Sequence, residues 1–461
     1  MTAVTISFVD NVLDYADESF FFDFRAQGHG VMIQFVWIYE HDVDLVALRR
    51  FHQNLGHGLL SRRVEPSPLP FGRSRWVQWS PPIAFDVAEK ARPRSELTAW
   101  TDEQAALPIS LDHGPPWRLA VQPLLEGGAA VAMLVAHGIA DGVGINNAIA
   151  DAVNGVTTDL GYPAAHSRTK TQALREDARQ LMRDLPHVRK ALVAAPRAAK
   201  EFPLRLRPGL KSGLFRRGAE NKSSALARVN TDPNKPLPSV TALVDIQSWD
   251  ERAKSMGGWS NSLLIGITTR LCEIFGWLDA DGLVNLTMPV NQREAEDTRG
   301  NACNVASMTL DPSLATDLGA IRAAVRTALS RLIETQDIIL APLALTPFIP
   351  TFTVGRLQYV VSRSANIACS NAGDLDPATN RPDGREAEWF YARHVRAEEL
   401  AGREYLQRAG GVFFPVFSGR LGGRVYTSIC YAKADGSTTT EYLTDVVRQV
   451  FDEFALPAVI Q

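Results

Sequence analysis

Residues 135–144 read VAHGIADGVG, and this stretch decides how the rest of the chain is interpreted. It starts at the end of residues 129–136, an unbroken apolar run that is typical of a buried strand. Beyond it, Ile145, Ile149 and Val153 recur every four positions, which places them on one face of a helix. The stretch is therefore predicted to form the turn between a buried strand and a helix.

Three residues of this turn, His137, Asp141 and Gly142, form the pattern H-x-x-x-D-G. Histidine is the side chain best suited to accept a proton near neutral pH. An aspartate four residues later can hold the loop through a buried ion pair or orient the imidazole, and the glycines leave room for a substrate beside the backbone. The alternative is a structural histidine followed by an aspartate that caps the helix.

The segments around this turn alternate between strand and helix patterns. Upstream, strands are predicted at residues 28–39 and 117–124, a helix at 44–55, and a hairpin at Glu126-Gly127-Gly128. Downstream, the predicted strands are residues 240–246, 284–290, 302–310, 367–370, 389–395, 412–417 and 424–432, and the predicted helices are 261–277, 314–335 and 438–454. This order predicts two α/β halves of similar size.

Length and composition set the class of protein. The chain has 461 residues, which favours two domains or one large domain with a pseudo-repeat. A 45% hydrophobic and 21% charged composition excludes disordered, collagen-like and disulfide-scaffold proteins. The net charge of −3 gives no sign of nucleic-acid binding, and the four scattered cysteines and nine histidines show no metal-ligand spacing. P-loop and G-x-S-x-G motifs are absent from the sequence.

The middle of the chain is strongly basic. Residues 166–229 contain 16 Lys or Arg and 5 Asp or Glu, a local charge of +11. We expect residues 166–235 to be a crossover between an N-terminal lobe, 1–165, and a C-terminal lobe, 236–461. The basic run is either a solvated face or a docking surface for an acidic partner or an anionic lipid. Without a signal-peptide pattern or a long apolar run, the protein is expected to be cytoplasmic.

The pattern H-x-x-x-D-G after a strand resembles the HHxxxDG motif of the CoA-dependent acyltransferase superfamily. That superfamily includes chloramphenicol acetyltransferases, nonribosomal peptide condensation domains and wax ester synthase/diacylglycerol acyltransferases. Further stretches resemble its other motifs in the expected order: Pro116-Trp117-Arg118-Leu119, Trp259 to Leu264 (WSNSLL), Met288 to Arg293 (MPVNQR), Gly300 to Asn304 (GNACN) and Ser370-Asn371-Ala372-Gly373. The resemblance thus spans most of the chain.

The chain departs from the family pattern at two places. Ala136 stands where the motif has its first histidine, which is usually a structural support in the family. The catalytic second histidine of the motif corresponds to His137. The stretch after Ser370 lacks the proline of the S-N-V-P-G signature of wax ester synthase-like proteins, which weakens assignment to that branch.

The resemblance implies two chloramphenicol-acetyltransferase-like α/β lobes with an active-site channel between them. His137 would be the general base, and Asp141 would pair with Arg293 across the lobe boundary. Gly142 would keep the channel open beside His137. The candidates for contacting the oxyanion or the substrate are Ser370, Asn371 and Asn304.

The implied activity is transfer of an acyl group from a CoA or carrier-protein thioester to a hydroxyl or amine. We expect a stand-alone condensation-type enzyme of secondary or complex-lipid metabolism, with a wax ester synthase/diacylglycerol acyltransferase as the alternative. An alternative of another class is a non-catalytic condensation-like domain that binds a carrier protein or a tailoring enzyme. No tightly bound cofactor or metal is expected. An acidic carrier protein is a possible partner for residues 166–229.

Overall fold

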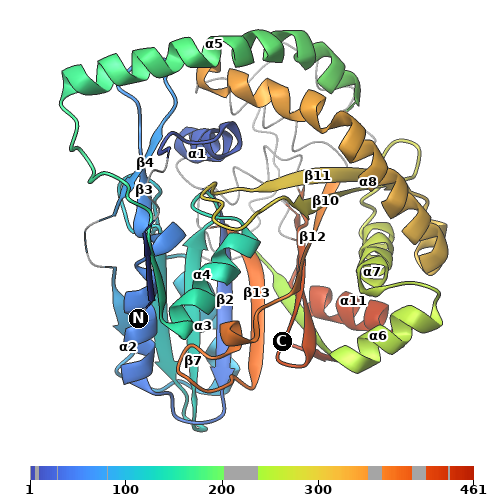
Figure 1. Ribbon diagram of the computed structural model, residues 1–461. Helices are drawn as coiled ribbons and strands as arrows, with labels where there is room; N and C mark the ends of the chain where they lie inside the picture. Colours follow the sequence, from blue (N-terminus) through green and yellow to red (C-terminus); the bar gives the residue numbers. More distant parts are fainter. Residues whose placement is uncertain are drawn as a thin grey trace, which may run out of the picture.

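The computed structural model describes residues 2–5, 10–27, 30–79, 81, 83–201, 237–350, 366–396, 412–433 and 437–461. Two large sheets, each covered by helices, stand side by side in Figure 1. The first has five strands in the order β13-β2-β7-β6-β5, with bounds Trp389–Arg396, Val31–Tyr39, Ala129–Ala136, Trp117–Pro123 and Phe85–Val87. The predicted mixed α/β architecture with two lobes is therefore present.

The apolar run at residues 129–136 forms β7, near the middle of the first sheet. It pairs antiparallel with β2 on one side and β6 on the other, and all eight of its side chains are buried. Burial on both faces explains why this strand is apolar throughout rather than alternating. Helices α2 (Leu45–Leu55), α3 (Leu97–Ala105) and α4 (Gly142–Asn154) belong to the same lobe.

The second sheet has seven strands and its own apolar core. Its order is β11-β10-β12-β15-β16-β9-β18, with bounds Cys303–Leu310, Val284–Asn291, Asn366–Asp374, Val416–Leu421, Arg424–Cys430, Ser239–Asp245 and Ala458–Ile460. Its helices are α6 (Ile246–Ser255), α7 (Ser260–Ile274), α8 (Leu318–Leu340) and α11 (Thr440–Glu453). The predicted helices and strands of this half are largely present.

Two predicted strands are each divided in the structure. Residues 424–432 form β16 and the start of β17 (Ala432–Lys433), with Tyr431 between them. Residues 412–417 form two strands, β14 (Val412–Phe413) and β15, because Pro415 between them has no backbone N–H to donate. A further difference concerns the division into lobes. Strand β13 belongs to the last third of the sequence, yet it pairs antiparallel with β2 along its whole length, from Trp389 opposite Ile38 to Arg396 opposite Val31. The C-terminal part of the chain therefore completes the first sheet.

The basic segment begins with α5 (Lys170–Glu201), which runs along the outer edge of the molecule near α8 (Figure 1). Two buried aspartates attach it to the first lobe: Asp177 to Arg75 and Arg168, and Asp184 to Arg73 at 2.8 Å. The rest of the predicted crossover, residues 202–236, lies outside the described residues. No helix in the described part of the chain has the length and hydropathy needed to cross a bilayer.

Candidate active site

His137 is the first residue after β7, and its position is fixed by the sheet. Its backbone N–H donates to the carbonyl of Val31 on β2, at 3.0 Å. The ring of Phe20, on α1 (Tyr15–Gln27), stacks parallel to the imidazole with 5.3 Å between centroids. The ring of His394, on β13, meets it at a right angle, with centroids 5.9 Å apart. The imidazole is therefore held by three elements distant in sequence.

Burial lowers the pKa of His137 from its usual value near 6.5, because the charged ring loses hydration. The Asp141 carboxylate, the backbone carbonyl of His137 and the Asn301 side chain act in the opposite direction, without offsetting the burial. The ring is therefore neutral at pH 7, as a general base must be. The Nδ1 atom of His137 is fully buried and has no well-formed hydrogen bond. The Nε2 atom is not enclosed in this way. Nε2 is thus the accessible nitrogen.

Asp141 joins the turn after β7 to a loop of the second lobe. One carboxylate oxygen, Oδ1, accepts the backbone N–H of Gly144 at 2.7 Å and so caps α4. The other, Oδ2, accepts from the Ala302 backbone at 2.8 Å and from Nη2 of Arg293 at 2.9 Å. The side chains of Asp141 and Arg293 are only 9% and 5% exposed, respectively. The ion pair expected from the resemblance is thus present and shielded from water.

Arg293 also organises the loop that follows it. Its guanidinium donates to the backbone carbonyls of Asp297, Arg299 and Gly300, at 3.0, 3.0 and 2.9 Å. The loop between β10 and β11 is therefore wrapped around one cation, and that cation is neutralised by a carboxylate of the first lobe.

A second carboxylate of the first lobe, Asp17 on α1, binds the same loop. It accepts the backbone N–H groups of Gly300 and Asn301, both at 2.7 Å, and the Asn301 side-chain amide at 3.2 Å. Burial raises the pKa of Asp17, and the nearby Arg62 guanidinium opposes this rise. Arg62 is completely buried, donates to the carbonyls of Ile139 and Thr298, and lies over the Trp76 ring. A second buried carboxylate, with the Arg62 cation nearby, thus supports the junction.

The arrangement also places Asn301 beside the imidazole. The amide nitrogen of Asn301 donates a hydrogen bond to Asp17. The Oδ1 atom of Asn301 and the Nδ1 atom of His137 are both buried without a well-formed hydrogen bond. The side chain of Asn301 is close enough to His137 to favour the protonated ring. Asp17 therefore fixes the amide nitrogen of Asn301, a residue whose side chain raises the pKa of the neighbouring imidazole.

The three candidates for contacting the oxyanion or substrate lie on strands of the second sheet, but their side chains differ in direction. Ser370 lies level with Phe417 of β15, so the two share one face of the sheet. Phe417 packs 4.8 Å from the His394 ring, so this face looks toward the site of His137. The Ser370 hydroxyl has no hydrogen bond in the described part of the chain.

Asn371 and Asn304 are engaged elsewhere. Asn371 points to the opposite face of β12, where its amide donates to Asn261 on α7 at 3.1 Å and its oxygen accepts from the Gly373 backbone. Asn304 donates to Gln336 on α8 at 3.1 Å. The structure therefore brings Ser370, but neither asparagine amide, toward His137.

The glycines of the motif have different surroundings. A β-carbon on Gly142 would meet only the edge of Phe417, at an ordinary 3.7 Å. On Gly144 it would lie 3.0 and 3.1 Å from the guanidinium atoms of Arg293. Gly144 is thus the glycine that the ion pair requires, a role the sequence analysis did not assign.

Sequence reasoning also missed Asp17, Arg62, Asn301 and His394. Asn301 lies inside a quoted motif, but neither its spacing nor its neighbours indicate that it faces His137. Among the described residues, no cluster of three or more potential ligands could hold a metal ion.

No protein-family model and no curated protein sequence matches the chain, but solved structures do. The first condensation domain of the CDA synthetase aligns with a TM-score of 0.57 and 14% identity over 98% of both chains. F. sporotrichioides TRI101, complexed with coenzyme A and T-2, gives 0.57 and 12% identity over 98% of this chain and all of its own. Wax ester synthase/diacylglycerol acyltransferase from Marinobacter aquaeolei VT8 gives 0.53 and 12% over 96% and 98%. The predicted two-lobed fold of condensation-type, CoA-dependent acyltransferases is confirmed.

The buried ion pair predicts strong coupling between Asp141 and Arg293. Either single change to Ala should lower the free energy of unfolding by about 3–5 kcal/mol, because it leaves the partner charge buried and unpaired. The double variant should lose less than the sum of the two. Arg299→Ala, which removes a 42% exposed partner of Asp297 in the same loop, is the control and should cost at most about 1 kcal/mol. Additive losses in chemical denaturation would contradict the coupling.

The glycine geometry predicts that Gly144→Ala is more damaging than Gly142→Ala. The first must displace the Arg293 guanidinium and should cost about 1–3 kcal/mol of unfolding free energy. The second gains helix propensity and meets no short contact, so its change should stay within about 0.5 kcal/mol. Repeating Gly144→Ala in an Arg293→Ala background should shrink its cost. Equal costs for the two glycines would show that the close contact is not the cause.

Proposed function

We propose that this protein is an acyltransferase that moves an acyl group from a CoA or carrier-protein thioester to a hydroxyl or amine, with His137 as general base. The observation that carries the proposal is the His137 imidazole at the junction of two lobes, with Nδ1 enclosed and Nε2 accessible. The fold is one that condensation domains and CoA-dependent acyltransferases use. Similarity at this level of identity supports the fold, and the reaction rests on the site itself.

In the proposed reaction, Nε2 of His137 takes the proton from the acceptor as its oxygen or nitrogen attacks the thioester carbonyl. The carbonyl π electrons move to oxygen and form a tetrahedral oxyanion. When this collapses, the carbon–sulfur bond breaks and the thiolate leaves with the proton held by the imidazolium. Base and acid are then the same group, so His137 ends the cycle neutral, and no acyl-enzyme is needed.

Asn301 would make the imidazole a competent base by selecting its tautomer. An acceptor oxygen beside Nδ1 favours the tautomer that carries its proton there, which leaves the lone pair on Nε2. Asp17 holds the Asn301 amide nitrogen, and in this proposal it would keep the amide oxygen turned toward the ring. Asn301 and Asp17 are positioning residues in this proposal, because neither would touch the substrate.

Ser370 is the proposed donor to the oxyanion. Its hydroxyl is uncommitted and lies on the face of β12 that looks toward His137. One such donor typically contributes about 10²–10³-fold to turnover. Asn371 and Asn304 remain weaker candidates, because their amides already have partners within the second lobe.

Within this class, we favour a stand-alone condensation-type enzyme of secondary or complex-lipid metabolism over a wax ester synthase/diacylglycerol acyltransferase. The competing proposal is from another class: a non-catalytic module that recruits a carrier protein or tailoring enzyme. Such a module would not need a general base. A carrier protein docked on the basic crossover stays a prediction. Five basic residues of that crossover, Arg205, Arg207, Lys211, Arg216 and Arg217, lie outside the described residues.

His137→Ala should lower turnover by about 10²–10⁴-fold, because it removes the group that accepts the proton. Product formation would be followed by mass spectrometry over acyl-CoA and acyl-carrier donors with alcohol and amine acceptors. His113→Ala, at a histidine whose side chain is 82% exposed, is the matched control and should keep full turnover. Turnover of a folded His137→Ala protein within tenfold of the unchanged protein would overturn the proposal and favour the binding module.

Asn301→Ala should lower the pKa of His137 further below 6.5, because it removes an acceptor that stabilises the protonated ring. NMR titration of the histidine ring protons measures this without knowledge of the substrate. Asn304→Ala is the control, since its amide binds α8, and it should leave the titration unchanged. A His137 pKa that rises in Asn301→Ala would contradict the proposed role of Asn301.

A further inference from the structure

Helix α5 presents an unusual surface to solvent. All eight of its basic residues are exposed, and none forms an ion pair in the part of the chain that the structure describes: Lys170, Arg175, Arg179, Arg183, Arg189, Lys190, Arg197 and Lys200. Its buried acids, Asp177 and Asp184, point inward and are bound by arginines of the first lobe. The negative charge of α5 is thus largely used internally, and its outer face is positive.

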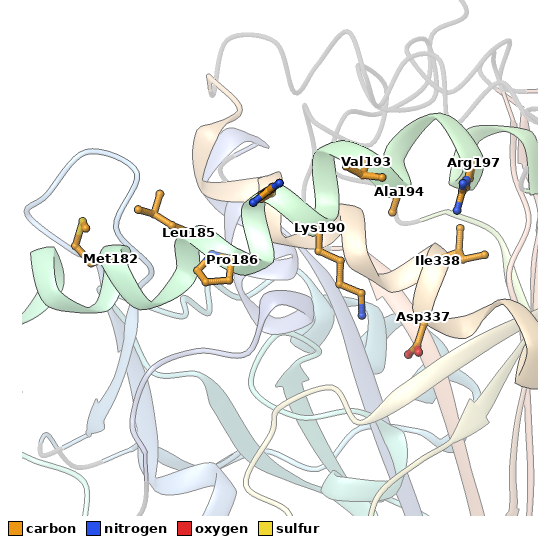
Figure 2. A pocket seen from close by; sticks show the side chains of 10 residues that line it. Met182, Leu185, Pro186, Lys190, Val193, Ala194, Arg197, Asp337 and Ile338 are labelled. Atoms are coloured by element: carbon orange, nitrogen blue, oxygen red, sulfur yellow. The ribbon is translucent and has the colours of Figure 1, made fainter.

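The same helix exposes large apolar side chains. Leu174, Met182, Leu185, Leu192 and Val193 are 43%, 66%, 45%, 62% and 64% exposed. Leu174, Leu185 and Leu192 are separated by 11 and 7 residues, so they lie along one side of the helix. Figure 2 shows Met182, Leu185 and Val193 on α5, and Lys190 and Arg197 extending toward Asp337 and Ile338 of α8. We define the outer face of α5 as the five apolar residues together with Arg175, Arg179, Arg183, Arg189 and Lys200.

Three properties of this face define its partner. The cations require an anionic partner, and arginine, which dominates here, suits phosphate oxygens in particular. The apolar side chains require a partner that offers an apolar phase. The face is also long, because α5 runs along the outer edge of the molecule (Figure 1). Its 32 residues give it a length of about 48 Å.

A bilayer meets all three requirements. A basic amphipathic helix can lie in the interface with its apolar side chains at the acyl boundary and its cations among the headgroups. An acidic protein would have to follow a helix about 48 Å long and also cover its apolar side chains. The chain itself does not offer the missing charge directly after α5, since residues 202–236 contain eight Lys or Arg and only two Asp or Glu.

We propose that the outer face of α5 binds the surface of an anionic phospholipid bilayer, with the helix parallel to the membrane plane. Attachment would be peripheral and reversible, because it depends on one helix face. It would weaken as salt shortens the Debye length from about 8 Å at physiological ionic strength to about 3 Å at 1 M.

The test is co-sedimentation of the full chain with vesicles of phosphatidylcholine alone or mixed with phosphatidylglycerol. We expect binding to the mixed vesicles to exceed binding to phosphatidylcholine by at least about tenfold. Arg179, Arg183 and Arg189 changed together to Gln should reduce it by about tenfold or more. Met182, Leu192 and Val193 changed together to Ser should also reduce it, without the salt dependence being lost.

The matched control changes Arg50, Lys90 and Lys254 to Gln, three exposed cations elsewhere on the surface. This control removes the same number of positive charges, and its vesicle binding should stay within about twofold of the unchanged protein. Circular dichroism should show that every variant is folded. Equal loss in the control would mean diffuse attraction and overturn the proposal, as would absence of binding to mixed vesicles. A different result would assign the face to a protein partner. In that case the protein would bind an acidic carrier protein saturably but would not bind vesicles, and the α5 variants would lose the carrier binding.

Discussion

The contact between Asp141 and Arg293 is the constraint on which the rest of the site depends. Asp141 ends the turn that carries His137, and Arg293 starts the loop that carries Asn301, so one ion pair sets the relative positions of both. Burying such an ion pair costs free energy, because both charges lose their hydration. The cost is tolerated because almost all the remaining polar atoms of the two side chains form hydrogen bonds. Both carboxylate oxygens accept backbone N–H groups, and the guanidinium donates to three carbonyls.

The need for hydrogen-bond partners in this buried loop also explains why α1 is essential to the junction. Its Asp17 takes the loop N–H groups that Asp141 does not reach, and its Phe20 covers one face of the imidazole. One helix therefore closes the loop and encloses the base. Enclosure lowers the pKa of His137, and the Asp141 carboxylate and the Asn301 side chain oppose that fall. A base whose pKa lies below its usual value is neutral at physiological pH, as a proton acceptor must be.

The sequence could predict what depends on local patterns. The apolar run before His137 indicated β7, the H-x-x-x-D-G spacing indicated the turn, and the resemblance implied the pairing with Arg293. Contacts between distant segments left no such signal. Asp17 and Gly300 are 283 positions apart, and β13 joins the first sheet from the far end of the chain. His394 reaches His137 only through that strand exchange, so no periodicity could have revealed it.

The position of Ala136 bears on whether the site is active. In the family pattern, this position holds the first of two histidines, and its absence is the sequence feature that favours a non-catalytic binding module. Ala136 is 4% exposed, lies opposite Met32 on β2 and belongs to the apolar core of the first lobe. A side chain at this position packs into the apolar core of the first lobe and not beside Nε2 of His137. Its replacement therefore alters a packing position and leaves the proposed base, its acceptor Asn301 and the ion pair in place.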